Sequence, residues 1–345
     1  MPRPNVLIFM TDQQQCQVVR PDHPCRTPHV ERLAAQGLRF ERAYTIAPHC
    51  CPSRASFMTG LMPNRHGVFN NVTTGTAINT GLRAGVVTFS EVLRASGYRL
   101  SLSGKWHVSR DEAPADRGWE ERHVTSPPQK QRPYERSRWE NPNTVPDRGE
   151  PRANGEIVRP GYTRLKLYGS FADRGPKGYE GTGDHRIVQN GIAALQELAS
   201  GDEPWFVYIG PNGPHDPFII PERYAKMYDP EQIPLPASYV DDLADKPRIY
   251  QRMRRDRWGQ LTEREVRESI AHYWGYCTMM DDLFGEVLQA LDETGAAENT
   301  LVIYMSDHGE YCGAHGLYMK GIPAFEEAYH VPTVVRWPAG IAQPG

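Results

Sequence analysis

The stretch that organises this 345-residue sequence is His49-Cys50-Cys51-Pro52-Ser53-Arg54-Ala55-Ser56-Phe57-Met58-Thr59-Gly60. A proline followed by helix-forming residues up to a glycine predicts a loop that tightens into a short helix, with Pro52 in its first turn. Cys50 would then lie beside unpaired backbone N–H groups at the positive end of the helix dipole, which favours a bound anion. Arg54, one turn further on, would present a planar guanidinium to the same place. The stretch therefore predicts an anion site next to a cysteine.

The pattern Cys50-x-Pro52-Ser53-Arg54-x-x-x-x-Thr59-Gly60 resembles the signature of type I sulfatases, which belong to the alkaline phosphatase superfamily. In that family a formylglycine-generating enzyme oxidises the signature cysteine to formylglycine, and the hydrate of this aldehyde is the nucleophile. The spacing to Pro52 identifies Cys50, rather than Cys51, as the modified residue. The alternative interpretation is a buried cysteine at an ordinary junction of loop and helix. That alternative fits an isolated Cys-x-Pro better than it fits the whole signature.

The composition limits the classes of function. The formal net charge is −3 with both signs interspersed, which gives no indication of a nucleic-acid partner. The 30 prolines and 31 glycines fit a loop-rich enzyme, and the six cysteines show neither zinc-type spacing nor the density of a disulfide scaffold. No apolar run approaches the roughly 20 residues that span a bilayer, and the N-terminal apolar run is too short for a signal peptide. We therefore expect a cytoplasmic, bacterial protein that binds neither nucleic acid nor membrane.

Buried apolar strands alternate with capped helices along the chain. Strands are predicted at residues 6–10, 38–45, 98–102, 205–209, 300–305 and 331–338. Helices are predicted at 28–36 with Thr27 as N-cap, at 89–96, at 184–198 and from a capping box at 262–265 to 294, and a tight loop is predicted at 62–67. The alternation agrees with the α/β fold that the resemblance implies, a large mixed, mostly parallel β-sheet sandwiched by helices.

Polar residues follow two of the predicted strands. Asp12 and Gln13 end the first strand, and Lys105 and His107 follow residues 98–102. Ligands bind at the carboxyl edge of open α/β sheets, and side chains two apart on an extended segment point the same way. A cation and an imidazole together suit binding an oxyanion and moving a proton. Without the resemblance, the better interpretation of Asp12 is a residue that forms a turn. The Lys105–His107 pair is then explained equally well by a surface loop or by a binding site.

The resemblance implies a metal site and a set of catalytic residues at these strand ends. One divalent cation, Ca²⁺ or alternatively Mn²⁺, would be bound by Asp12, Gln13, Cys50 in its modified form, Asp307 and His308. The catalytic residues would be Cys50, Arg54, Lys105, His107, His215 and Lys320. Many family members have aspartate in place of Gln13, whose amide oxygen can still bind a hard cation. Many have asparagine in place of His308, and an imidazole ligand keeps manganese open as the alternative.

By the same resemblance the reaction is hydrolysis of a small-molecule or saccharide sulfate ester to an alcohol and inorganic sulfate. The metal, Arg54, Lys105 and Lys320 would neutralise the sulfate oxygens. His215 would assist the leaving oxygen, and His107 would take a proton from the remaining hydroxyl of the hydrate. The alternative is a phosphonate monoester or phosphodiester hydrolase with the same nucleophile. The Lys105–His107 pair argues against it, because related phosphonate monoester hydrolases lack that pair.

On the basis of this resemblance, we interpret residues 1–345 as a sulfatase catalytic domain. Residues 109–183 are rich in Pro, Arg, Asp, Glu and Gly, and we interpret them as an insertion that faces the substrate, with a surface excursion as the alternative. The smaller C-terminal subdomain usual in sulfatases is expected to be missing or truncated. His66 and His315 are expected to be structural, and Asp216 is expected to do no more than brace its turn.

Overall fold

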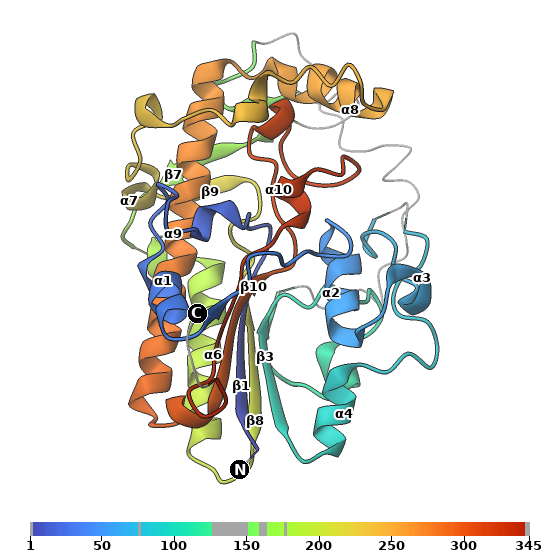
Figure 1. The fold of residues 1–345 in the computed structure, drawn as a ribbon, viewed down its shortest axis with the longest axis vertical. Coiled ribbons are helices and arrows are strands. Elements are labelled where there is room, and N and C mark those ends of the chain that lie inside the picture. Colours follow the sequence, from blue (N-terminus) through green and yellow to red (C-terminus); the bar gives the residue numbers. More distant parts are fainter. Residues whose placement is uncertain (1–2, 75–76, 126–150, 159–163, 176–177, 342–345) are drawn as a thin grey trace.

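The computed structural model describes residues 3–74, 77–125, 151–158, 164–175 and 178–341. A sheet occupies one half of the molecule, with helices on both of its faces, and shorter elements lie beyond the carboxyl ends of its strands (Figure 1). Within the described ranges, none of the helices combines the length and the apolarity that crossing a membrane requires.

The central sheet has seven strands in the order β2-β11-β10-β1-β8-β3-β4. These are β1 (Asn5–Thr11), β2 (Leu38–Arg39), β3 (Arg99–Gly104), β4 (Glu120–Val124), β8 (Trp205–Gly210), β10 (Thr300–Ser306) and β11 (Thr333–Arg336). β1 pairs in parallel with β10 and β8, and β3 pairs in parallel with β8 and β4. Only β11 runs against its neighbours. The predicted mixed, mostly parallel sheet is confirmed.

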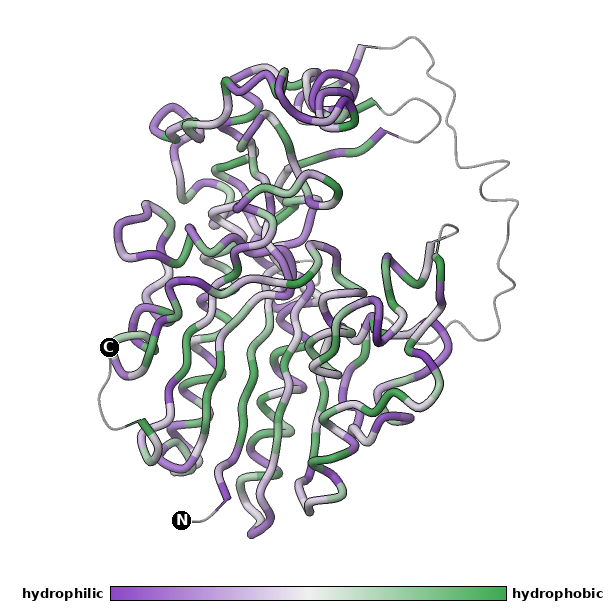
Figure 2. Tube along the Cα trace, turned by 45° about the vertical axis from the view of Figure 1, so that its right-hand side comes forward, coloured by the Kyte–Doolittle hydropathy of each residue, from purple (hydrophilic) through white to green (hydrophobic). Residues whose placement is uncertain are grey.

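Helices cover both faces of this sheet. One layer holds α1 (Pro28–Ala35), α6 (Gly183–Ala199) and α9 (Glu263–Glu293), and the other holds α2 (Cys50–Thr59) and α4 (Phe89–Ala95). Alternate side chains of β1 enter different cores: Leu7 and Phe9 pack under the first layer, Ile8 and Met10 under the second. This double burial explains the unbroken apolar runs of the strands, which Figure 2 shows in green. Each fully buried large apolar side chain contributes about 1.5–3 kcal/mol.

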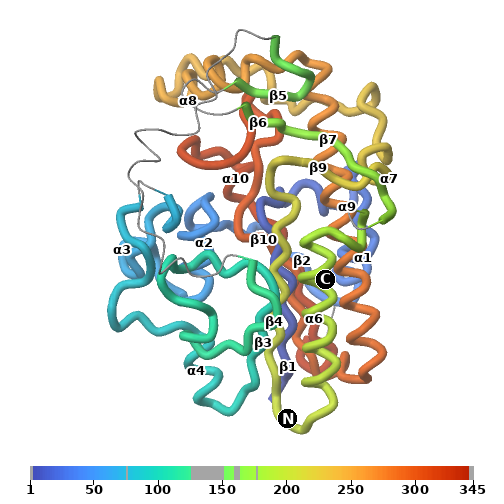
Figure 3. Tube along the Cα trace, turned by 180° about the vertical axis from the view of Figure 1, so that it is seen from behind, coloured from blue at the N-terminus to red at the C-terminus, as the bar shows by residue number. Residues whose placement is uncertain are grey.

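Shorter elements surround the carboxyl end of the sheet. Two small sheets pair β5 (Glu156–Ile157) with β6 (Leu165–Lys166), and β7 (Tyr168–Phe171) with β9 (Phe218–Pro221). Figure 3 shows them beyond the ends of the main strands. The short helices are α3 (Pro63–His66), α7 (Glu222–Ala225), α8 (Arg248–Arg252) and α10 (Glu326–Tyr329).

The start of α1 differs from its predicted form. The capping boxes predicted at the starts of α4 and α9 are present, but the Thr27 hydroxyl makes no cap and has no partner within the described residues. Instead the buried carboxylate of Asp281, on α9, accepts the backbone N–H groups of His29 at 2.9 Å and Val30 at 2.8 Å. The cap therefore comes from another helix, which no local pattern could indicate.

Two predicted segments were wrong in their extent or type. The strand predicted at 38–45 ends after Arg39, because only Leu38 and Arg39 pair with β11. Beyond Arg39 the pairing becomes irregular: Phe40 N–H donates to Thr333 at 2.9 Å and a single bridge pairs Tyr44 with His330, while the Phe40 side chain is 49% exposed. The tight loop predicted at 62–67 contains α3, with Pro63 in its first turn and Gly67 in the left-handed conformation as its C-cap.

The segment 109–183 is more than loops. β4 lies within it and forms the edge of the main sheet beside β3. β4 is an edge strand with the sequence Glu120-Glu121-Arg122-His123-Val124. It packs few apolar side chains, so its sequence has no apolar run that would predict a strand. The substrate-facing role of the insertion stays a prediction, since residues 126–150 and 159–163 lie outside the described residues.

Candidate active site

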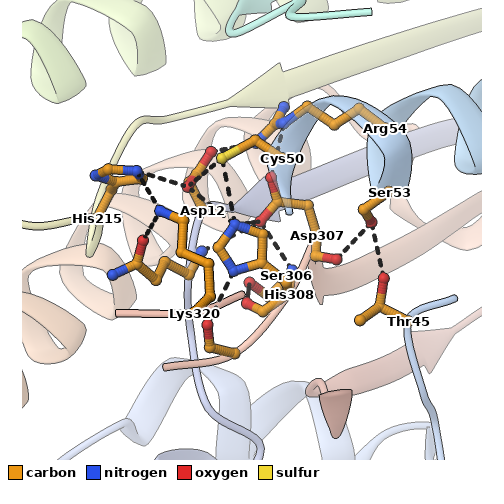
Figure 4. A network of polar contacts seen from close by, with 12 residues as sticks. Asp12, Thr45, Cys50, Ser53, Arg54, His215, Ser306, Asp307, His308 and Lys320 are labelled. Carbon is orange, nitrogen blue, oxygen red and sulfur yellow. Dashed lines mark hydrogen bonds and ion pairs between the residues drawn. The ribbon is translucent and has the colours of Figure 1, made fainter. Parts of the chain in front are cut away.

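Four segments converge at the carboxyl edge of the sheet. Asp12 follows β1, Lys105 follows β3 and Asp307 follows β10. Backbone hydrogen bonds between neighbouring strand ends fix their positions: Lys105 N–H donates to Gly210 at 2.8 Å, and Asp307 N–H donates to Thr11 at 3.2 Å. The fourth segment is α2, in the helix layer that also holds α4. Its first residue, Cys50, lies at the same place. Figure 4 shows the side chains of Asp12, Cys50 and Asp307 pointing toward one another.

A compact buried cluster forms where these segments meet. The ligand atoms of Asp12, Cys50, Asp307 and His308 all lie within 4.8 Å of one another, and all four residues are buried. The Cys50 sulfur lies 3.3 Å from His308 Nε2 and 3.7 Å from Asp12 Oδ1. The sulfur occupies the place that the oxygen of a modified residue 50 would take.

The chemistry of this cluster fits a divalent cation. His308 Nδ1 lies 2.9 Å from the Gly309 carbonyl oxygen, which can only accept, so the ring proton is on Nδ1. Burial acts to lower the pKa of His308, but Asp307 and Cys50 outweigh it and raise that pKa. In its neutral form the ring presents a lone pair on Nε2, 3.8 Å from Asp12 Oδ1 and 3.7 Å from Asp307 Oδ1. Two carboxylates and an imidazole facing one another with acceptor atoms are a ligand set for a metal ion.

Most of the N–H donors of Arg54 are engaged by the protein. Its Nε donates to Asp307 at 2.8 Å and its terminal nitrogens donate to Asp12 at 3.0 Å, to the Lys105 carbonyl at 3.0 Å and to the Tyr208 hydroxyl at 2.9 Å. The side chain is 1% exposed. Four of its five donors are committed, so it aligns the two carboxylates. The predicted contact of Arg54 with the sulfate stays a prediction.

The two carboxylates of the cluster have opposite pKa shifts. Burial and the Cys50 charge act to raise the pKa of Asp12, but Lys105, whose Nζ is 2.6 Å away, outweighs them with Arg54 and holds that pKa well below its usual range. Burial and the neighbouring Asp12 charge raise the pKa of Asp307, although Arg54 opposes them. A cation between them would favour the charged form of both.

Cations also surround the Cys50 sulfur. Burial acts to raise the pKa of the Cys50 thiol, but Lys105, Lys320 and His308 outweigh it and bring that pKa well below its usual value. His107 also acts to lower the pKa of this thiol, and its Nδ1 is buried without a partner among the described residues. The predicted convergence of Lys105 and His107 is present. Its predicted reason is wrong, because His107 has φ 54° and the segment is not extended there.

The outer side of the site is built by His215 and Lys320. The two predicted residues meet, with Lys320 Nζ 2.5 Å from His215 Nε2, and His215 Nε2 lies 4.0 Å from Asp12 Oδ1. The His215 side chain is 30% exposed and Lys320 9%. This pair therefore lies between solvent and the buried cluster, where a leaving group would depart.

Gln13 contacts this outer pair. Its amide oxygen accepts a hydrogen bond from Lys320 Nζ, and its amide nitrogen donates to Glu310 and to Asp216, the latter at 3.0 Å. Asp216 therefore does more than brace its turn.

Several supporting residues escaped the sequence analysis. Ser53 donates to the Asp307 carbonyl at 2.5 Å and accepts from Thr45 at 2.9 Å, which ties α2 to the segment after β10. Glu310 is fully buried, and burial raises its pKa to about 7. Ser53 belongs to the quoted signature and could have been found there. Tyr208 and Glu310 carry no local signal, because their partners lie far away in the sequence.

Two histidines are structural, as predicted. His66 is buried and its Nε2 lies 2.9 Å from the Ser56 hydroxyl. His315 lies 2.7 Å from Asp241 and stacks on Phe325 with ring centroids 3.7 Å apart. Neither contacts the cluster.

Comparison with known proteins identifies relatives over the whole chain. The family model described as Sulfatase matches residues 4–344. An uncharacterized sulfatase, YidJ of Escherichia coli (strain K12), is 32% identical over 349 residues, covering 99% of this chain and 64% of the relative. A choline-sulfatase of Rhizobium meliloti (strain 1021) is 27% identical over 368 residues, covering 99% and 64%. The chain thus spans less than two thirds of the length of these relatives.

The fold is also shared with solved structures. A phosphonate monoester hydrolase of Agrobacterium radiobacter superposes with a TM-score of 0.72 at 27% identity, covering 97% of this chain and 68% of that one. Such a match shows that the arrangement of sheet and helices is common to enzymes that act on different oxyanion esters.

Proposed function

Since this chain belongs to the sulfatase family, we propose that it hydrolyses a sulfate ester to an alcohol and inorganic sulfate. The observation that carries this proposal is the placement of Cys50 within 4.8 Å of the ligand atoms of Asp12, Asp307 and His308. A nucleophile precursor, two carboxylates and an imidazole then share one buried place, reached from three segments of the chain.

The charges around the cluster favour an anionic substrate. Two carboxylates, Asp12 and Asp307, lie among three cationic side chains, Arg54, Lys105 and Lys320. Because the Asp216 carboxylate lies 3.8 Å from Lys320 Nζ, the three cations and three carboxylates balance, and a bound cation would give the site its excess positive charge. Preorganised charge of this kind stabilises an oxyanion whose negative charge grows in the transition state, and burial strengthens it.

We propose that Asp12, Asp307, His308 and the modified residue 50 bind one divalent cation, Ca²⁺ or Mn²⁺, which would polarise the sulfate group. Cys50 would be converted to formylglycine by a formylglycine-generating enzyme, and its hydrate would supply the nucleophilic hydroxyl. Arg54 keeps the two carboxylates in position for this cation. Lys105 would face a sulfate oxygen next to residue 50.

The histidines are placed for proton transfer on the two sides of residue 50. His215 Nδ1–H donates to the Asp216 carbonyl at 2.6 Å, so its Nε2 is the acceptor that faces Lys320. Lys320 and His215 together would deliver a proton to the leaving oxygen. His107, which acts to lower the pKa of the Cys50 thiol, would accept the proton of the second hydroxyl at residue 50.

Phosphonate monoester hydrolysis is the second candidate, because the solved structure of such an enzyme shares 27% identity and the fold. The Lys105–His107 pair favours sulfate. The test compares 4-nitrophenyl sulfate, choline sulfate and 4-nitrophenyl phenylphosphonate, with the protein co-produced with a formylglycine-generating enzyme. We expect kcat/KM for the better sulfate ester to exceed that for the phosphonate by about 100-fold or more. The reverse ratio would establish the second candidate. Hydrolysis of none of them by protein that carries formylglycine would contradict both.

A further inference from the structure

Gln13 has an unusual backbone for its residue type. Its φ is +70°, a left-handed conformation that non-glycine residues adopt at a cost of about 1–3 kcal/mol. Two contacts hold it there: its N–H donates to Asp307 Oδ1 at 3.1 Å, and its carbonyl oxygen accepts from the Tyr273 hydroxyl at 2.9 Å. The surrounding structure therefore aims this side chain in one direction.

The partners of the Gln13 carboxamide determine which end is oxygen. Lys320 can only donate, so the group that it contacts is the amide oxygen. Asp216, whose pKa His215 and Lys320 hold below its usual value in spite of burial, is an acceptor, so the group 3.0 Å from it is the amide nitrogen. The amide oxygen of Gln13 therefore accepts its hydrogen bond from Lys320.

Glu310 fixes this carboxamide to the loop that carries Lys320. One oxygen of Glu310 accepts from the Gln13 amide. The other accepts the backbone N–H groups of Cys312, at 3.0 Å, and of Met319, the residue before Lys320. A buried side chain thereby ties the end of β1 to the backbone beside the lysine.

Among the described residues, Lys320 makes two hydrogen bonds. Its ammonium has three N–H donors. Gln13 Oε1 takes one and His215 Nε2, 2.5 Å away, takes another. The third can address a substrate oxygen. Without Gln13 the flexible lysine would keep only His215 as a hydrogen-bond partner, with the Asp216 carboxylate 3.8 Å away.

We propose that Gln13 is a positioning residue that holds the Lys320 ammonium against His215, with Asp216 and Glu310 orienting its amide, and that Gln13 is not a ligand of the cation. This revises the expectation from the sequence and rests on the proposed function. Its consequence is that Gln13 acts on the leaving group, whereas the cation site is complete without it.

The test uses Gln13→Met, which keeps the length of the side chain and removes its hydrogen bonds, and Asp216→Asn, which removes the charge that orients the amide. Gln14→Met is the matched control: its amide oxygen accepts from Thr11 and Tyr304 and contacts neither the cluster nor Lys320. Folding of each variant is checked by its thermal unfolding.

Three readouts separate positioning from metal binding. Calorimetric titration with Ca²⁺ and Mn²⁺ should give a Kd within about threefold of wild type for Gln13→Met, since loss of a ligand or its support typically costs 10–100-fold. Trace acetylation of Lys320 relative to the exposed Lys226 should rise about threefold or more, as expected for loss of one hydrogen bond. The kcat/KM for choline sulfate should fall about tenfold more than that for 4-nitrophenyl sulfate, whose leaving group needs little protonation.

Asp216→Asn should move the last two readouts in the same direction, and Gln14→Met should move none. A metal Kd weakened tenfold or more in Gln13→Met would overturn the proposal, and so would unchanged acetylation of Lys320. The first two readouts need no turnover. A wild-type protein that hydrolyses no sulfate ester would therefore refute the proposed function. The acetylation ratio would still show whether Gln13 holds Lys320.

Discussion

Two pairs of buried acids lie side by side at the carboxyl edge of the sheet, and they have different partners. Asp12 and Asp307 face the charged groups Arg54 and Lys105 and converge with Cys50 and His308. Asp216 and Glu310 share the neutral amide of Gln13, and Asp216 also lies 3.8 Å from Lys320 Nζ. The first pair has oxygens directed at a place where a cation fits. The second pair has its oxygens occupied by N–H groups.

The difference shows that burial and charge alone do not identify a metal site. Three of the four acids are buried and the side chain of Asp216 is only 8% exposed, but only the first pair lies within 4.8 Å of an imidazole nitrogen and a sulfur. The second pair acts through hydrogen-bond direction, because a carboxylate can only accept and so dictates how an amide lies. The partners of an acid, more than its burial, separate binding from orientation.

The largest effect is expected from the nucleophile that the first pair faces. Cys50→Ala should lower kcat for sulfate ester hydrolysis by about 10⁴-fold or more, as removal of a catalytic nucleophile does in other enzymes. Cys51→Ala is the matched control. Cys51 lies in the core between the sheet and the layer of α2 and α4, where its sulfur accepts from Val72 N–H at 3.4 Å. Its replacement should cost about 1 kcal/mol of stability and leave the hydrolysis in place. Equal losses in the two variants would contradict the assignment.

Removal of the cation comes next. A chelator should lower kcat/KM by about 10³-fold, because a bound metal contributes several kcal/mol of charge stabilisation in the transition state. Asp307→Asn should prevent metal from restoring activity, whereas Asp216→Asn should leave metal affinity unchanged. Calorimetric titration of the two variants measures this directly. Weaker binding in Asp216→Asn than in Asp307→Asn would reverse the comparison between the two pairs.

Arg54 should matter for stability as well as for the site. Arg54→Met leaves two buried carboxylates without their shared cation, and we expect the free energy of unfolding in chelator to fall by about 3–5 kcal/mol. Arg99 supplies the control, since its contacts with Glu120 and Glu197 are made by a side chain that is 37% exposed. Arg99→Met should cost about 1 kcal/mol or less. Urea unfolding with equal losses for both would show that the buried network carries no special weight.

The smallest effect is expected from Tyr208. Its hydroxyl accepts from Arg54 at 2.9 Å, so Tyr208→Phe leaves one buried guanidinium N–H unpaired while the ring still packs. The free energy of unfolding should fall by about 1–2 kcal/mol. If the loss matched that of Arg54→Met, the hydroxyl would be the main support of Arg54, and the carboxylates would not be.

The sequence was most informative where one segment carries both an element and its function. The apolar run of β1 followed by Asp12, and that of β10 followed by Asp307 and His308, predicted strands whose polar ends meet, because parallel strands present their carboxyl ends at one edge. The signature predicted α2 with Cys50 at its start. Asp12, Cys50, Asp307 and His308 are brought together by the fold.

What could not be predicted depends on contacts between distant parts of the chain. Gln13 meets Glu310 across 297 positions and Arg54 meets Tyr208 across 154, so neither pairing leaves a local pattern. For the same reason the sequence did not indicate that Arg54 donates to residues at other strand ends. β4 was missed because an edge strand with charged residues lacks the apolar run by which central strands are recognised.

The central claim is that residue 50 becomes the nucleophile of a sulfatase, and the mass of the peptide that contains it tests this most directly. The protein would be co-produced with a formylglycine-generating enzyme, digested and analysed by mass spectrometry across residues 49–54. The account predicts an aldehyde or its hydrate at residue 50 and an unmodified thiol at Cys51. An intact thiol at Cys50 in folded, metal-loaded protein that still hydrolyses sulfate esters would contradict it.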